Sequence, residues 1–399
     1  MMHFDESIQM IENLEINNYK IKNLPLMEAQ GYVLAADIVA DHNSPEFPTS
    51  AMDGYAIIHE DMALGTLRVG SINPAGSALK EEVIGGTCIK TFTGSLMPHG
   101  ADTLIPIENV EVDGDEIIIK QEVPQGFSVR EPGENYAKGQ LLISKGTKID
   151  FPQIGVMASL NIANVLVYEK PTVAIISTGS ELLELGEEQT NDAQIRSSNN
   201  YILEAIVKKY DGEPLQLGCI KDDKATITKA IFDALEKSDI VVTTGGVSVG
   251  DFDFVKDVIY ELGCDVVFKG VRVKPGQHIM VARKDDKFII GLPGFAYSST
   301  VTALLYLVPL IEKLQHGKCH LRQVKAKLGE AFVKRAKKAE FTACNVSLLQ
   351  GEYYVDFKGK KVGSSAILTN MLGDVALLVT SEDDTSKEIG DEVTVLLFG

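Results

Sequence analysis

The sequence predicts a multidomain protein of the α/β plus β class. We expect a doubly wound parallel sheet, an inserted β domain before it, and a small β-barrel or sandwich after it. Three observations carry this prediction. The 399 residues exceed what one hydrophobic core usually serves. From Pro171 to about Gln315, continuous apolar runs typical of buried strands alternate with segments whose apolar residues recur at helical spacing. Short alternating runs, divided by Gly, Pro and Asn, precede this stretch from Asp41 to about Ile149 and follow it from Leu321 to Gly399.

The first 40 residues predict two helices. Ile8, Ile11 and Leu14 recur at helical spacing. A second helix is predicted over residues 25–40, because Pro25 suits a first helical turn and apolar residues follow it. In the β-rich stretch that comes next, the sequence "DGDE" at residues 113–116 predicts a hairpin turn.

The central stretch predicts strands that are buried on both faces and joined by helices. Each helix presents one apolar stripe, and Ser198 or Asn199 is expected to cap the first of them. The expected strands cover residues 172–178, 214–220, 239–246, 265–273 and 287–294, and the expected helices cover residues 198–210, 222–238, 253–263 and the long segment after Tyr297. This alternation is typical of a parallel, doubly wound sheet.

Three glycine-rich loops leave strands of this sheet, at residues 177–184, 243–253 and 291–299. Ligands of open parallel sheets bind at the carboxyl ends of the strands, and glycines let the backbone approach an anion closely. The loop at Gly245 and Gly246 therefore predicts a site for a phosphate-like group, with Asp251 and Asp253 available for a divalent cation. Alternatively, the two glycines only turn the chain and one of these aspartates caps the next helix.

Composition narrows the class of ligand and the location. A formal charge of -18 argues against a nucleic-acid groove. Any other anionic ligand therefore needs a local cluster of basic side chains, which Arg272 and Lys274 can supply. We expect no signal peptide, because the first 16 residues lack a basic segment followed by an apolar core. We also expect no membrane helix, since the window that comes closest to one, residues 300–311, stops at Glu312. Five dispersed cysteines speak against a disulfide framework. Together these features favour a cytoplasmic protein.

Several motifs resemble one family, the molybdopterin molybdenumtransferases, or MoeA family, which includes the gephyrin E domain. They occur in the family's order between Ser44 and Ser299: "SAMDGYA", "TG" with "PHGADTLIPIENV", "STGSEL", "SNNYIL", "TTGGVSVGDFDFVKD", "KPG" and "GLPG". The resemblance implies that adenylylated molybdopterin and molybdate yield molybdenum cofactor and AMP, with Mg²⁺ present. Tungstate stays open as the physiological anion.

The resemblance also implies an architecture. It predicts N-terminal helices with a linking β segment (residues 1–44 and 134–170), an inserted β domain (45–133), a MogA- and MoaB-like α/β domain (171–320) and a C-terminal β-barrel (321–399). It implies a homodimer whose active cleft joins the α/β and barrel domains of one subunit with the inserted domain of the other. A molybdopterin adenylyltransferase and molybdoenzyme maturation proteins are the further partners it suggests.

Residue roles follow from matching the motifs position by position. The implied catalytic residues are Asp53, Thr93, Glu181 and Lys274. The implied substrate-binding residues are Gly245, Gly246, Ser248, Arg272, Pro275, Gly276, Gln277, Ser298 and Lys338. For the metal, the resemblance implies Asp253 with Asp222 or Asp223, and the sequence does not choose between the last two.

Some positions depart from the family's pattern. Gln277 and His278 stand where the family commonly has Lys-Pro, Phe295 stands within "GLPGFA" in place of "GLPGNP", and Lys338 stands for an arginine. Several of these positions belong to the family's oxyanion-binding face. They leave a second hypothesis, a molybdopterin-binding carrier with impaired metal insertion. A third, an enzyme that shares only the α/β domain, such as an adenylyltransferase or a nucleotide amidohydrolase, requires a chain without "SAMDGYA" and the barrel.

Overall fold

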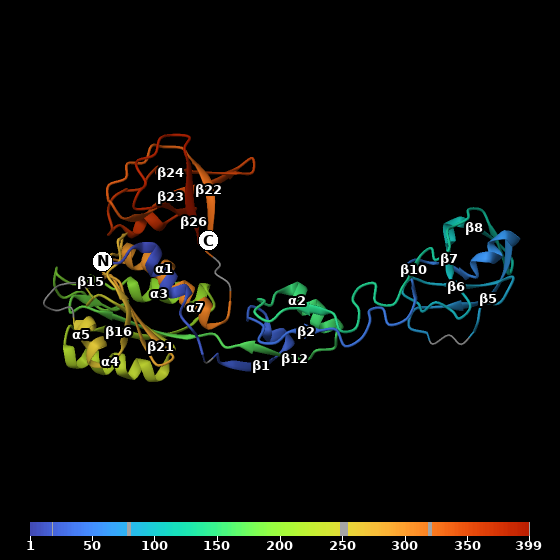
Figure 1. Cartoon of the computed structure of the whole chain (residues 1–399), viewed down its shortest axis with the longest axis horizontal. Coiled ribbons are helices and arrows are strands. Elements are labelled where there is room, and N and C mark those ends of the chain that lie inside the picture. Colours follow the sequence, from blue (N-terminus) through green and yellow to red (C-terminus); the bar gives the residue numbers. More distant parts are fainter. Residues whose placement is uncertain (18, 78–80, 248–253, 318–320, 399) are drawn as a thin grey trace. The chain divides into compact units, whose positions relative to one another are not determined.

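The computed structural model describes residues 1–17, 19–77, 81–247, 254–317 and 321–398. The chain forms two compact units (Figure 1). The larger unit contains Met1–Ala35, Gly146–Asp150 and Asn164–Gly399, and the smaller unit contains Ala36–Lys145 and Phe151–Ala163. Ser248 and Asp253, two of the predicted site residues, lie outside the described residues.

A six-stranded sheet forms the centre of the larger unit. Its strands, in spatial order, are β16 (Glu213–Ile220), β13 (Thr172–Thr178), β17 (Ile240–Thr244), β21 (Lys287–Leu292), β20 (Met280–Lys284) and β18 (Asp265–Lys269). The first four strands run parallel, as predicted. The pairs β20–β21 and β18–β20 are antiparallel, so this edge of the sheet is mixed. A tight turn with Asp285 at φ 55° joins β20 to β21, and such a short connection allows only antiparallel pairing.

Helices cover both faces of this sheet, which confirms the doubly wound fold. One face carries α1 (Phe4–Glu12), α3 (Asn199–Lys209), and a continuous helical stretch made of α6 (Ala296–Thr302), the π-helical segment η4 (Ala303–Leu307) and α7 (Val308–Leu314). The other face carries α4 (Lys224–Lys237) and α5 (Phe254–Glu261). Alternate residues of each strand point to opposite faces, so β13 sends Ile175 into one core and Ile176 into the other.

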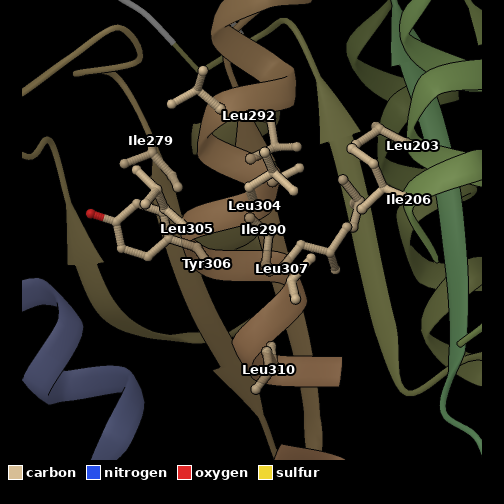
Figure 2. Close-up of a cluster of buried hydrophobic side chains, with 14 of the residues drawn as sticks. Leu203, Ile206, Ile279, Ile290, Leu292, Leu304, Leu305, Tyr306, Leu307 and Leu310 are labelled. Atoms are coloured by element: carbon tan, nitrogen blue, oxygen red, sulfur yellow. The ribbon is translucent and has the colours of Figure 1, made fainter. Parts of the chain in front are cut away.

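The first of these two cores is drawn in Figure 2. Ile290 and Leu292 of β21 lie with Leu304 and Leu307 of η4, and all four side chains are buried. Full burial of one such side chain stabilises the fold by about 1.5–3 kcal/mol. The apolar stretch after Tyr297 is therefore a core helix, which fixes the preceding "GLPG" loop at the carboxyl edge of the sheet.

The prediction of a second N-terminal helix over residues 25–40 is wrong. Only Leu26–Ala29 is helical, as the 3-10 turn η1. Before it, β1 (Ile21–Pro25) pairs antiparallel with β12 (Asn164–Tyr168), and after it Leu34 forms a bridge to Val167. Gly31 adopts φ 83°, which a helix cannot continue through. Pairing with a distant strand decides the conformation here, not the local apolar spacing.

The C-terminal strands form a closed barrel, so the barrel alternative is correct and the sandwich is not. They are β22 (Arg322–Leu328), β23 (Ala339–Leu349), β24 (Glu352–Asp356), β25 (Val375–Thr380) and β26 (Glu392–Leu397). The order β23-β24-β22-β26-β25 closes through the pairing of β25 with β23. The short strand β19 (Val273–Lys274) pairs parallel with β23, and it thereby joins the barrel to the α/β part of the same unit.

The smaller unit is built on a six-stranded sheet of its own, in the order β7-β4-β6-β5-β9-β8. The strands are β4 (Gly54–Ile57), β5 (Thr66–Asn73), β6 (Thr87–Thr91), β7 (Thr103–Pro106), β8 (Val110–Asp113) and β9 (Glu116–Ile119). The pairing of β8 with β9 confirms the predicted hairpin. Tyr55, Leu67, Ile105 and Ile117 are buried in its core.

Shorter elements complete the two units. The smaller unit also contains β2 (Ile38–Val39), β3 (Thr49–Ser50), η2 (His59–Leu64), η3 (Ile107–Asn109), β10 (Val129–Arg130), β11 (Leu141–Ile143) and α2 (Phe151–Ser159). The larger unit also contains β14 (Leu182–Leu183), β15 (Ile195–Arg196) and η5 (Leu368–Met371). No helix in the described parts of the chain combines the length and the apolar character needed to span a bilayer.

Candidate active site

The carboxyl ends of the four parallel strands lie along one edge of the larger unit's sheet. The loops that leave them are joined by backbone hydrogen bonds. The N–H of Gly179 donates to the carbonyl of Ile220 at 3.0 Å, and the N–H of Gly245 donates to the carbonyl of Leu292 at 3.1 Å. The structure therefore brings the described parts of the three glycine-rich loops together at the edge where the sequence predicted a ligand.

Gly245 and Gly246 occupy positions that no other residue fits. Their φ angles are 86° and 70°, in the left-handed region. A Cβ on Gly245 would lie 2.8 Å from the carbonyl oxygen of Thr178, and one on Gly246 would lie 2.6 Å from Cγ2 of Val255. This loop presses directly against its neighbours, which leaves backbone rather than side chains at the sheet edge.

Polar side chains beneath the loops form a network that the sequence reasoning missed. The Ser177 hydroxyl lies 2.6 Å from Oδ1 of Asn200 and 2.8 Å from the Thr244 hydroxyl. Asn199 donates from Nδ2 to the carbonyl of Gly294 at 2.8 Å, and its buried Oδ1 has no hydrogen-bond partner among the described residues. The signal was present, because "SNN" opens the helix that follows the first glycine-rich loop.

The acidic residues at this edge have different tasks. Asp222 accepts a hydrogen bond on Oδ2 from the N–H of Ser180 at 3.0 Å, so it is joined to the loop that carries the exposed Glu181. Asp223 caps α4, since its Oδ2 accepts from the N–H of Thr226 at 2.8 Å and from the Thr226 hydroxyl at 2.5 Å. These bonds, the one from the hydroxyl first, lower the pKa of Asp223.

The "KPG" turn lies beside the third glycine-rich loop. Gly276 adopts φ 97°, and a Cβ there would lie 2.2 Å from Cγ2 of Thr302 and 3.6 Å from Cγ of Pro293. The turn is thus packed between α6 and the "GLPG" loop. The peptide bond before Pro275 is cis.

The predicted cations of this region form contacts between the α/β part and the barrel segment. Lys274 forms an ion pair with Glu340 at 2.9 Å, and Arg272 forms one with Glu382 at 2.8 Å. Lys338 donates to Oε1 of Gln277.

Two more polar groups of this face are also hydrogen-bonded. The side-chain nitrogen of Gln277 lies 2.8 Å from Nε2 of His278. Ser298 donates its hydroxyl to the carbonyl of Ser365 at 2.9 Å. The polar residues of this face are therefore positioned by hydrogen bonds and ion pairs, whereas the Phe295 side chain is 64% exposed.

Asp53 and Thr93 lie together in the smaller unit. Oδ1 of Asp53 accepts hydrogen bonds from the backbone N–H and from the hydroxyl of Thr93, each at 2.8 Å. The backbone bond, followed by the hydroxyl bond, lowers the pKa of this exposed carboxyl. The pair presents an ionised carboxylate held in one orientation.

Two cavities of the larger unit lie away from the predicted site residues. A cavity of about 310 Å³ lies at the amino-terminal edge of the sheet, lined by Lys20, Asp239 and Lys287 among others. A groove of about 600 Å³ runs along α1 and α7 to the barrel. Neither is lined by a predicted site residue. We assign the site to the carboxyl edge because the chemistry-bearing side chains converge there.

This fold and this edge define a class of protein: a doubly wound α/β unit with glycine-rich loops, carboxylates and cations paired with barrel residues at the carboxyl edge of its sheet. A protein of Haemophilus influenzae named molybdopterin molybdenumtransferase is 35% identical over 297 residues, which cover 74% of this chain and 73% of the relative. A Nostoc protein of the same name is 31% identical over 382 residues, covering 93% of this chain and 87% of the relative. The chain belongs to the MoeA family of molybdopterin molybdenumtransferases.

Family models and a solved structure agree. The model of the MoeA N-terminal region (domain I and II) matches residues 2–161, and the model of a probable molybdopterin binding domain matches residues 174–313. The crystal structure of a molybdopterin biosynthesis moeA protein from Pyrococcus horikoshii has a TM-score of 0.85 and 29% sequence identity, with both chains covered completely. The resemblance seen in the motifs is thus confirmed as membership.

Proposed function

We propose that the chain inserts molybdate into adenylylated molybdopterin and releases AMP, as a step of molybdenum cofactor biosynthesis. One observation carries the proposal: the three glycine-rich loops and the "KPG" turn converge at one sheet edge in a member of a transferase family. The backbone at Gly245 and Gly246, together with Ser248, would hold the pterin phosphate, and Glu181 would face the adenylate. Donors fixed before binding cost little reorganisation when charge develops on the leaving phosphate.

We include Mg²⁺ in the proposal, held by Asp222 and Asp253. No group of three or more His, Cys, Asp or Glu side chains that could hold a metal exists within the described residues. The two carboxylates of Asp222 and Asp253 still fit Mg²⁺, because this ion commonly binds one or two carboxylates together with substrate phosphate oxygens and water. The bound ion would offset negative charge on the phosphates. Asp223 is the weaker candidate, because it already caps α4.

The oxyanion would bind on the face formed by Arg272, Gln277 and Lys338, and Lys274 beside this face would contact the phosphates of adenylylated molybdopterin. Gln277 and His278 can donate hydrogen bonds but carry less fixed charge than the Lys-Pro common in the family. The carrier hypothesis rested on these substitutions and is not favoured, because relatives that cover most of the chain are named as transferases. If this face limits insertion, Gln277→Lys with His278→Pro raises turnover, and an unaltered turnover shows that it does not.

We further propose a cytoplasmic homodimer with the four-part domain division predicted above, in which Asp53 and Thr93 complete the site of the partner subunit. The four cysteines that the structure describes, Cys88, Cys219, Cys264 and Cys344, are free thiols, which supports a reducing compartment. Exchange of substrate and product with a molybdopterin adenylyltransferase and with molybdoenzyme maturation proteins belongs to the same proposal.

Reconstitution of an apo-molybdoenzyme tests the function. The purified protein, adenylylated molybdopterin, Mg²⁺ and molybdate are incubated together, and the apoenzyme is then added. The proposal predicts molybdoenzyme activity that depends on the chain and on molybdate. An apoenzyme that stays inactive while the pterin remains bound would favour a carrier instead.

A further inference from the structure

Glu340 is a buried carboxylate at the junction between the barrel and the "KPG" turn. It lies directly opposite Lys274 in the parallel pairing of β19 with β23. Its Oε1 forms an ion pair with the Lys274 ammonium, and the two atoms are 2.9 Å apart. The Glu340 side chain is 4% exposed and the Lys274 side chain is 26% exposed, so the pair reaches from the interior to the surface.

Stability does not readily account for a glutamate here. The second carboxylate oxygen, Oε2, is buried and has no hydrogen-bond partner among the described residues. Burying a charge that is only partly satisfied is costly, and apolar residues often replace buried ion pairs without loss of stability. By contrast, Lys327 and Glu352 form a cross-strand pair of the same barrel in which both side chains are half exposed. Glu340 therefore calls for a role other than holding the barrel together.

We propose that Glu340 is a positioning residue that holds the Lys274 ammonium ready for the anionic substrate. The inference rests on the proposed function, in which Lys274 contacts that substrate. A free lysine side chain has many rotamers and loses their entropy on binding, whereas one anchored by a buried carboxylate has already lost it. The ammonium has three N–H donors, and the bond to Oε1 uses one of them. The described residues record no hydrogen bond for the other two.

Through the Glu340 side chain, the barrel thereby influences the affinity of the protein for its anionic substrate. The neighbouring contacts are consistent with this, since the "KPG" turn is packed against Thr302 and Pro293 and cannot itself move the lysine far. The rigid turn fixes the lysine backbone, and Glu340 fixes the charged end.

A binding experiment without oxyanion tests the inference. Adenylylated molybdopterin is mixed with the full-length protein, and bound pterin is measured by ultrafiltration. Glu340→Ala raises the Kd at least about tenfold, because a hydrogen bond to a charged group is lost. Glu340→Gln, whose amide oxygen still accepts from Lys274, gives a smaller increase. The control Glu352→Gln, at the exposed pair, leaves the Kd within about twofold of wild type.

A double-mutant cycle separates positioning from a general structural effect. If Glu340 acts through Lys274, then Glu340→Ala adds nothing to the Kd of Lys274→Ala. Equal effects of Glu340→Ala in both backgrounds would overturn the inference, as would an unchanged Kd in a folded Glu340→Gln variant. Thermal unfolding verifies that each variant is folded, and Glu340→Gln replaces Glu340→Ala if the latter is not. Because binding is measured without oxyanion, missing AMP release would count against the proposed function alone.

Discussion

The pair Asp53 and Thr93 illustrates what a single residue contributes. Asp53 follows β3 in an exposed turn, and its only role in the fold that the described contacts record is to accept two hydrogen bonds from Thr93 and to offer its carbonyl to Ile107. An exposed carboxylate that is held in one orientation is better suited to binding or catalysis than to stabilising a hydrophobic core. The sequence motif identified both residues, although their bonding to each other was not predicted.

Replacing Asp53 therefore separates function from stability. Asp53→Ala is expected to reduce AMP release at least about 100-fold, the lower limit typical of a lost acid–base group. The melting temperature stays close to that of wild type, because the side chain is exposed. Asp113→Ala, at the exposed hairpin turn of the same unit, serves as the matched control. Full turnover by Asp53→Ala would remove this residue from the site.

Thr93→Val tests the electrostatics of the pair. The Thr93 bonds lower the pKa of Asp53 below its ordinary value of 3.8, so the stability that they confer is present above pH 3.8 and is lost as pH falls through the lowered pKa. Valine removes the hydroxyl bond and keeps the backbone bond. The pKa of Asp53 then rises part of the way toward 3.8, which a carbon-detected NMR titration of the carboxyl group measures. An unchanged pKa would show that the backbone N–H suffices.

At the scale of elements, helix α4 distinguishes two adjacent aspartates that the sequence could not. Asp223→Ala removes the helix cap and is expected to lower the melting temperature while AMP release is retained. Asp222→Ala is expected to reduce AMP release while the melting temperature stays close to that of wild type. Asp223→Asn, which can still cap, is the control. Loss of AMP release in the stable variant Asp223→Asn would assign the function to Asp223 instead.

The "KPG" turn makes a second prediction at this scale. Gly276→Ala forces φ 97° on a residue with a Cβ and places that atom 2.2 Å from Thr302, so it destabilises the fold by about 1–3 kcal/mol or more. Gly294→Ala is the matched control, since its Cβ would lie 3.9 Å from the nearest atom, Cα of Gly245. Denaturant unfolding of both variants measures the difference. Equal stabilities would contradict the packing described for the turn.

How much the sequence could predict varies by element. The strands β13, β17 and β21 were predicted because each is a continuous apolar run. The helices α3 and α4 were predicted because their apolar residues recur at helical spacing. Residues 25–40 were predicted wrongly, because β1 pairs with β12, which is distant in the chain. The strand β20 was not predicted, and its antiparallel pairing with β18 and β21 was therefore missed as well.

The site follows the same rule. Motifs identified the glycine loops and the cations, but not the groups that position them. Glu340 was missed even though a charge beside the buried run at residues 341–344 indicates a paired, buried carboxylate. Its partner, Lys274, is 66 residues away in the chain, and only the pairing of β19 with β23 brings the two together.

At the scale of the whole molecule, the acidic surface and the local basic face have to be reconciled. The formal charge of -18 opposes an approaching anion, so the face with Lys274, Arg272 and Lys338 must act at short range. The residues of the proposed site are divided between two units, with Asp53 and Thr93 in the smaller and all other described ones in the larger. The proposed function therefore predicts that substitutions in either unit reduce catalysis.

AMP release from adenylylated molybdopterin by the purified protein tests the central claim most directly. The reaction contains Mg²⁺, and either molybdate or tungstate is added or both are left out. The account predicts that AMP is released only when an oxyanion is present, together with formation of the cofactor. Tight binding of the pterin with no AMP released under any condition would contradict it, and would leave a carrier that keeps the phosphate loop without the metal step.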